Sequence, residues 1–407
     1  MALVLAVTVS ATAVAGDEAE RNAGLGPTAK VLFLRVDFPN EKSTKVRSDF
    51  TNAEGTGLID RLAAYYAEVS RGRFGIEAVL SKKVYPLPRR KRAYVSRPTL
   101  MIDDALRLAA RPSPKGEREL LEEIDPDVVF VFFAGPGAES DIKRQRPGLP
   151  WSNAVSGALP APIPSWSGPR GVIVGDQPMH ELSPFGVMAH EFGHILGLPE
   201  LYAPNKRHEG IGIWGLMGQG TWVGMGNQPP HLSAWSKLRL GWVDPIVVES
   251  SQTIALPAVE EKGVVVKIFA KKDADPHEYF LIENRRRVGA DRRAPGEGLL
   301  IWHVDDSRTS FRRSQDVPKH KHLDLLTADT WPSDLDVGHT SGGNRGDDGD
   351  PFRDRDLAVG PDTKPGTGAY DGTRGRFSIR NVSPAAPTMT FDVEFEDEGT
   401  TGTPTPD

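Results

Sequence analysis

The sequence predicts an α+β fold, in which a mixed sheet with helices is followed by a β-rich C-terminal region. Three observations support this fold class. Strand-like apolar runs alternate with helical periods in the first half of the chain, which is typical of a sheet covered by helices. From Ser251 onward the strand-like runs have no strong helix between them. The 42 glycines and 34 prolines indicate many turns and long loops.

The first half contains the alternating elements. Apolar runs and helical periods predict strands at 30–38, 74–80 and 127–135 and helices over 57–70 and 101–110. Residues 135–167 are rich in Pro, Gly and Ser, which indicates a long loop. The segment 171–175 that follows is short enough to be an edge strand.

The second half predicts a β-rich region over residues 246–396. Its strand-like runs are "VVVKIFA", "EYFLIENR", "GLLIWHVDD" and "TMTFDVEF". An acidic, glycine-rich insertion from Ser333 to Gly375 interrupts them. The tail over 397–407 has a linker-like composition, so we expect a disordered end or a linker there.

Residues 1–15 predict a signal peptide. Their apolar run contains Ala13 and Ala15 in the spacing that signal peptidases recognise, although it lacks a basic leader. A first strand or a disordered start is the alternative. No later segment approaches the roughly twenty apolar residues that span a bilayer. We therefore expect a secreted protein of the bacterial export type, without a membrane span and monomeric.

Composition excludes several kinds of site. The chain has no cysteine, so it cannot form disulfides, cysteine-rich metal sites or a cysteine nucleophile. Its formal net charge is -6, which gives no general attraction to nucleic acid or to anionic membranes. We expect no nucleic-acid partner.

The stretch "GVMAHEFGHILGLPELY" predicts a helix over 184–196. Ser183 suits the N-cap, Pro184 the first helical position and Gly197 a left-handed C-cap. Both ends of the helix are therefore marked in the sequence.

Two histidines on this helix predict a metal site. His190 and His194 are one turn apart and project from the same face. Two imidazoles in this spacing bind one zinc ion, and Glu191 reaches the zinc-bound water as a general base. The alternative is a pair of packed, hydrogen-bonded core histidines.

The residues after the helix strengthen the metal prediction. Gly197 lies three residues after the second histidine, and Glu200 lies three residues further. A sharp turn at Gly197 can return Glu200 to the imidazoles as a third ligand. Two histidines, one carboxylate and an open water position are typical of a catalytic zinc site rather than a structural one.

The stretch "HEFGHILGLPELY" resembles the zinc motif of the immune inhibitor A-type secreted metallopeptidases. Similar stretches follow the family in order, from about Lys30 to about Phe395: "VLFLRVDFPN", "YYAEVSRGRFGIE", "IGIWGLMGQGTW", "HLSAWSKLRLGWV", "EYFLIENRRR", "PGEGLLIWHVDD" and "NRGDDGDPF". The resemblance implies a zincin-like catalytic domain over residues 28–245. It also implies a zinc endopeptidase that acts on protein or peptide substrates.

Two departures from the family pattern concern the third ligand. The family usually has Asp where this chain has Glu200, and another acid where this chain has Ala203. Glutamate is a competent zinc ligand, so Glu200 is our prediction. If the family uses the later acidic position, Glu209 or a water would have to take its place.

Other residues receive supporting roles. Met217 is expected in a turn that forms a packed floor beneath the histidines, as in related zincins. Tyr202 is expected either to donate its phenol to the oxyanion or to anchor the turn. His231 could also donate to the oxyanion, but a lone histidine is more typical of a packing residue. His208 and His303 are expected to be structural.

The acidic insertion raises the prospect of a calcium site. Asp347, Asp348, Asp350 and Asp354 are closely spaced among glycines, which suits oxygen coordination of Ca²⁺. The EF-hand pattern is incomplete, and a solvated acidic loop is the alternative.

These features predict a secreted zinc-dependent endopeptidase. Two alternatives remain open at the level of sequence. One is a zinc hydrolase of non-peptide amides or esters. The other is a secreted binding or adhesion module whose zinc site is idle.

Overall fold

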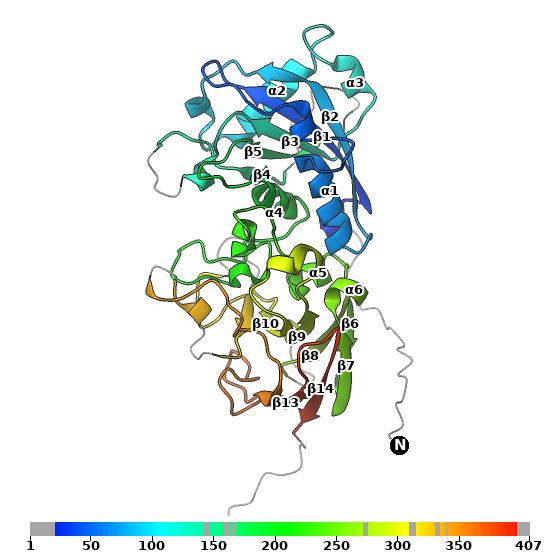
Figure 1. The fold of residues 1–407 in the computed structure, drawn as a ribbon, viewed down its shortest axis with the longest axis vertical. Coiled ribbons are helices and arrows are strands. Elements are labelled where there is room, and N and C mark those ends of the chain that lie inside the picture. The colour runs from blue at the N-terminus through cyan, green and yellow to red at the C-terminus, as the bar shows by residue number, and fades with distance from the viewer. Residues whose placement is uncertain are drawn as a thin grey trace, which may run out of the picture.

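The computed structural model describes residues 21–396, except 142–145, 158, 160–162, 164–165, 167, 272–275, 309–314, 330–333 and 339–340. The predicted signal peptide and the tail over 397–407 lie outside these residues. One sheet with helices forms the N-terminal part and two further sheets form the C-terminal part, with helix α4 between them (Figure 1). The mixed α/β architecture and the β-rich C-terminal region are confirmed.

The first sheet has the strand order β2-β1-β3-β5-β4. Its strands are β1 (Thr28–Asp37), β2 (Gly75–Pro86), β3 (Val128–Phe133), β4 (Asn153–Val155) and β5 (Arg170–Gly175). All pairs are parallel except β4 with β5. The prediction of an edge strand at 171–175 is wrong, because β4 covers the outer side of β5. A three-residue strand inside a Pro- and Gly-rich segment has no periodicity that would reveal it.

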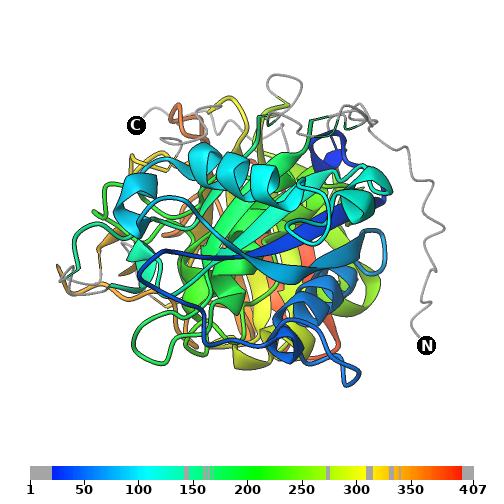
Figure 2. The same ribbon diagram turned by 90° about the horizontal axis from the view of Figure 1, so that it is seen from above.

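Helices cover both faces of the first sheet. α1 (Leu58–Val69) and α4 (Phe185–Ile195) pack on the face that contains Phe33, and α2 (Pro98–Ala109) packs on the face that contains Leu34. Figure 2 shows α1 and α2 on opposite sides of the sheet. A short helix, α3 (Arg118–Glu122), precedes β3. Among the described residues, none of the helices has the length and apolarity needed to cross a bilayer.

The β-rich half consists of two sheets with the orders β11-β10-β9-β8-β6 and β12-β13-β14-β7. Their strands are β6 (Asp244–Val247), β7 (Gln252–Pro257), β8 (Val264–Phe269), β9 (Glu278–Arg285), β10 (Gly298–Asp305), β11 (Leu323–Leu326), β12 (Arg355–Val359), β13 (Phe377–Val382) and β14 (Thr388–Phe395). Strand β12 lies inside the predicted acidic insertion. Among the strands that the structure describes here, β6 and β8 pair in parallel and the other pairs are antiparallel.

The two halves share one hydrophobic core. It contains Phe33 of β1, Phe192 of α4, and Leu281 and Trp302 of β9 and β10. Helices α5 (Ala234–Arg239) and α6 (Val259–Lys262) also contact β9. The other side of β9, including Phe280, packs against the third sheet, as expected from the two-residue period of a strand. The domain boundary near residue 245 remains a prediction.

Candidate metal centre

Helix α4 is followed by a sharp turn. The helix begins at Phe185, one residue later than expected, and the hydroxyl of Ser183 accepts the N–H of Phe185 at 3.2 Å. After Ile195 the chain turns at Gly197, whose φ is +89°. The N–H of Leu198 then donates to the carbonyl of Gly193 at 3.1 Å. This is the left-handed C-cap that the glycine predicts.

The turn brings the three predicted ligands together. The ligand atoms of His190, His194 and Glu200 all lie within 4.8 Å of one another. Nε2 of His190 is 3.1 Å from Oε2 of Glu200, and Nε2 of His194 is 3.3 Å from Oε1. The alternative ligand Glu209 is not in this group; its Oε2 accepts a hydrogen bond from Nε of Arg345 at 3.2 Å.

Both imidazoles are held in the orientation that a metal requires. Nδ1 of His190 is 3.1 Å from the carbonyl oxygen of Leu216, and Nδ1 of His194 is 2.8 Å from that of Leu198. A carbonyl only accepts, so each Nδ1 has the hydrogen and each Nε2 faces Glu200. Second partners of this kind orient the histidine ligands of metal sites. The donor set therefore fits a divalent cation such as zinc.

The charges at the site agree with this donor set. Burial opposes ionisation of Glu200, but the two neighbouring imidazoles hold its pKa well below its usual range. Burial alone would lower the pKa of His190, and the adjacent carboxylate of Glu200 raises it instead. The site thus contains an ionised carboxylate between two histidines, which attracts a cation.

Glu191 lies in a different environment from Glu200. Burial raises the pKa of Glu191 to about 7, while the charge of His194 and a backbone hydrogen bond from Ala154 act in the opposite direction. Perturbed carboxylates of this kind are common at catalytic sites.

Met217 lies against the helix between the two histidines. A Cβ atom on Gly193 would come within 2.5 Å of the Met217 sulfur, so the Met217 side chain packs closely against the helix at this glycine. The carbonyl of Met217 also accepts the N–H of Leu201, next to Glu200, at 2.9 Å. Its position agrees with a floor beneath the site, and its role remains a prediction.

The ring of Tyr202 lies beside the centre, with its centroid 6.2 Å from that of His190 and an interplanar angle of 28°. His303, His231 and His208 are not in the group of ligand atoms. His303 stacks between Phe280 and Tyr370, at centroid distances of 4.2 and 4.1 Å. His231 is buried, with Nε2 3.6 Å from Glu68, and His208 accepts the N–H of Gly210. Their structural roles remain predictions.

Thr221 was not predicted from the sequence. Its hydroxyl lies 3.0 Å from Nδ1 of His190 and donates to the carbonyl of Leu216 at 3.2 Å. Thr221 lies in the 3-10 helix η6 (Gln219–Trp222), far along the chain from the end of α4, and contact with a backbone carbonyl leaves no sequence signal. Only its place in the Gly-rich stretch "GQGTW" could have drawn attention to it.

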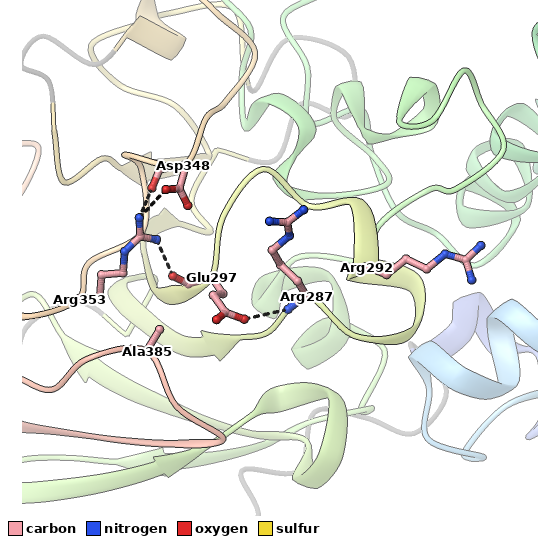
Figure 3. Close-up of a pocket in the computed structure, with 6 residues that line it drawn as sticks. All are labelled: Arg287, Arg292, Glu297, Asp348, Arg353 and Ala385. Atoms are coloured by element: carbon pink, nitrogen blue, oxygen red, sulfur yellow. Dashed lines mark hydrogen bonds and ion pairs between the residues drawn. The ribbon is translucent and has the colours of Figure 1, made fainter.

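The acidic insertion does not bring all its aspartates together. The carboxylates of Asp347 and Asp350 gather with that of Asp329, which was not predicted. Asp348 instead pairs with Arg353 at 2.8 Å and lines a separate pocket (Figure 3). That pocket is lined by Arg287, Arg292, Glu297, Asp348, Arg353 and Ala385, and contains none of the residues of the metal centre. A calcium site that includes Asp348 remains a prediction, and this ion pair disfavours it.

Comparison with known proteins agrees with the geometry. Residues 173–243 match the family model "Immune inhibitor A peptidase M6, catalytic domain". This match confirms the resemblance over the segment that contains α4, Glu200 and Met217.

Two curated relatives are similar to part of the chain. Over 145 residues, 33% of the chain, it is 31% identical to the pre-pro-metalloprotease PrtV of Vibrio cholerae serotype O1. Over 125 residues, 27% of the chain, it is 31% identical to Immune inhibitor A of Bacillus thuringiensis subsp. alesti. The aligned parts span 15% and 18% of those proteins.

A solved structure is also similar to the chain. It is catalytic inactive OgpA from Akkermansia muciniphila, in complex with an O-glycopeptide (glycodrosocin) substrate. The match covers 69% of this chain and 84% of that one, at 13% identity and a TM-score of 0.30. A TM-score this low supports no further argument.

Proposed function

We propose that the chain is a secreted zinc-dependent endopeptidase with a zincin-like catalytic domain. His190, His194 and Glu200 are the proposed zinc ligands, and Glu191 is the proposed general base. The observation that supports this most is the convergence of the three ligand atoms within 4.8 Å, with both Nε2 atoms directed at the carboxylate. The match to the peptidase M6 catalytic domain and the metalloprotease relative agree with it.

The proposed chemistry assigns a task to each group. Zinc supplies a Lewis acid that polarises a carbonyl and lowers the pKa of water. Glu191 takes a proton from the attacking water and passes it to the leaving amine. The phenol of Tyr202, beside His190, donates to the oxyanion. The carbonyls of Leu216 and Leu198 keep the imidazoles in place.

The edge strand β4 is the proposed substrate support. It is the last strand in its sheet, and it packs against α4. Its residues Asn153, Ala154 and Val155 are all partly exposed. An extended peptide can pair with such an edge through main-chain hydrogen bonds, which would bring a peptide bond to Glu191, the neighbour of Ala154.

The test compares the wild type with Glu191→Gln in zinc content and in hydrolysis of a quenched peptide. We expect both proteins to hold zinc, and the variant to lose activity by about 10²- to 10⁴-fold. Glu209→Gln is the control and should retain activity. A wild type that binds zinc but cleaves only non-peptide esters or amides would refute the peptidase. A wild type that binds no zinc would favour a binding module with an idle site.

A further inference from the structure

One short segment contacts His190 and also residues next to His194 and Glu200. It runs over 211–217 and includes the 3-10 helix η5 (Gly212–Trp214). The carbonyl of Leu216 holds Nδ1 of His190, and Met217 packs beneath the helix. The carbonyl of Met217 and the N–H of Ile211 both bond to Leu201, next to Glu200. We call residues 211–217 the floor segment. A shift of this segment would move His190 and Glu200 together.

The floor segment is fastened to the acidic insertion at two points. The N–H of Ile213 donates to the carbonyl of Arg345 at 2.7 Å. The indole Nε1–H of Trp214 donates to Oδ2 of Asp350 at 2.6 Å. Trp214 is 1% exposed and Asp350 is fully buried, so neither group exchanges this contact for water.

A buried arginine of β9 fastens the same segment from another side. Nη1 of Arg285 donates to the carbonyl of Trp214 at 3.3 Å. Its Nε and Nη2 bind both oxygens of Asp291 at 2.9 and 2.5 Å. Asp291 in turn accepts the N–H of His231 at 3.0 Å, and the carbonyl of His231 accepts the N–H of Leu216 at 3.2 Å. A continuous chain of contacts thus leads from β9 to the carbonyl that holds His190.

We infer that the β-rich half is an integral part of the zinc site, and that Trp214, held by Asp350 and Arg285, is a positioning residue for His190 and Glu200. This inference rests on the proposed function. It also assigns a role to the acidic insertion, because Asp350 holds Trp214 and thereby helps to position the proposed zinc ligands. It also means that the segment 173–243, which contains the ligands, depends on residues beyond it.

The matched experiment compares Trp214→Phe with Trp235→Phe. Trp235 is also buried, at 4% exposure, and its Nε1–H also donates to an aspartate, Asp306, at 2.9 Å. Its indole lies against Asp306 and the ring of His322, whose centroid is 4.5 Å away. Both variants therefore lose one hydrogen bond from an indole to a carboxylate, but only Trp214→Phe loses it within the floor segment. The zinc dissociation constant is measured by competition with a chelator, and thermal unfolding of the metal-free protein is measured alongside.

We expect Trp214→Phe to raise the zinc dissociation constant by about tenfold or more, in the range of outer-shell changes at metal sites. Trp235→Phe should change the zinc dissociation constant by less than about twofold. It should lower the thermal stability of the metal-free protein about as much as Trp214→Phe does. The inference would be overturned if both variants bound zinc as tightly as the wild type, or if both bound it more weakly by the same factor.

A second variant covers the case in which Trp214→Phe does not fold. Asp350→Asn keeps the shape but leaves only a neutral amide oxygen as acceptor for the indole of Trp214, so the zinc dissociation constant should rise in the same direction by a smaller factor. An unchanged constant in a folded Asp350→Asn protein would overturn the inference. A wild type that binds zinc without cleaving peptide refutes only the peptidase, since the comparison of the variants still holds. A wild type that binds no zinc refutes both.

Discussion

Thr221→Val tests the orientation of His190 with the least disturbance. Valine replaces the hydroxyl by a methyl group of similar size, in a side chain that is 5% exposed. The change removes a partner 3.0 Å from Nδ1 of His190 and the bond to the Leu216 carbonyl at 3.2 Å. Both contacts lie directly behind the proposed ligand atom.

The magnitude follows from what remains after the change. Loss of an outer-shell partner typically costs about 10- to 100-fold in metal affinity, equivalent to about 1.4–2.7 kcal/mol. The Leu216 carbonyl still accepts from Nδ1 at 3.1 Å. We therefore expect the lower end, about a tenfold weaker zinc affinity.

The assay is chelator competition for zinc, with the peptide hydrolysis rate measured at saturating zinc. Thr221→Ser restores the hydroxyl and should recover most of the wild-type affinity. If Thr221→Val binds zinc as tightly as the wild type, the hydroxyl does not position His190. If Thr221→Ser is as weak as the valine variant, packing of the methyl group explains the loss instead.

Three further predictions concern the ligand, the turn and a buried acid. Glu200→Gln should weaken zinc binding far more than Glu209→Gln, because only Glu200 lies with the histidines; equal effects in the chelator assay would reassign the third ligand. Gly197→Ala should cost about 1–2 kcal/mol of unfolding free energy, because φ is +89°, whereas Gly157→Ala, with open space around it, should cost less in the same denaturation experiment. Burial raises the pKa of Asp176 to about 6, so the folded state retains a proton that the unfolded chain releases near pH 4. This contribution of up to about 3 kcal/mol is complete below pH 4 and is lost as the pH rises through 6; an Asp176→Asn protein with the same pH dependence of stability would contradict it.

The sequence predicted the elements whose signals are local. The buried strands and the helices of the first sheet appeared where apolar runs and helical periods placed them. The spacing of His190 and His194 placed both imidazoles on one face, because a helix turns once in 3.6 residues. Gly197 predicted the turn that brings Glu200 back to the two histidines, since a left-handed backbone favours glycine. The proposed ligand set could therefore be predicted from one continuous stretch.

The sequence could not predict contacts between distant segments. The order of β4 and β5 depends on pairing across a loop, and the separation of Asp348 from Asp347 and Asp350 depends on Arg353. The partners of His190 are a carbonyl at Leu216 and a hydroxyl at Thr221, and neither follows from a local pattern.

The side chains proposed to bind a metal could be identified from the sequence, because they are close along one helix and one turn. The residues that hold them in place are known only from the three-dimensional structure. Trp214 is fastened by Asp350 and Arg285, which lie 136 and 71 residues away along the chain. Such contacts form only when the β-rich half packs against residues 211–217, since hydrogen-bond partners are selected by distance in space and leave no periodicity in the sequence.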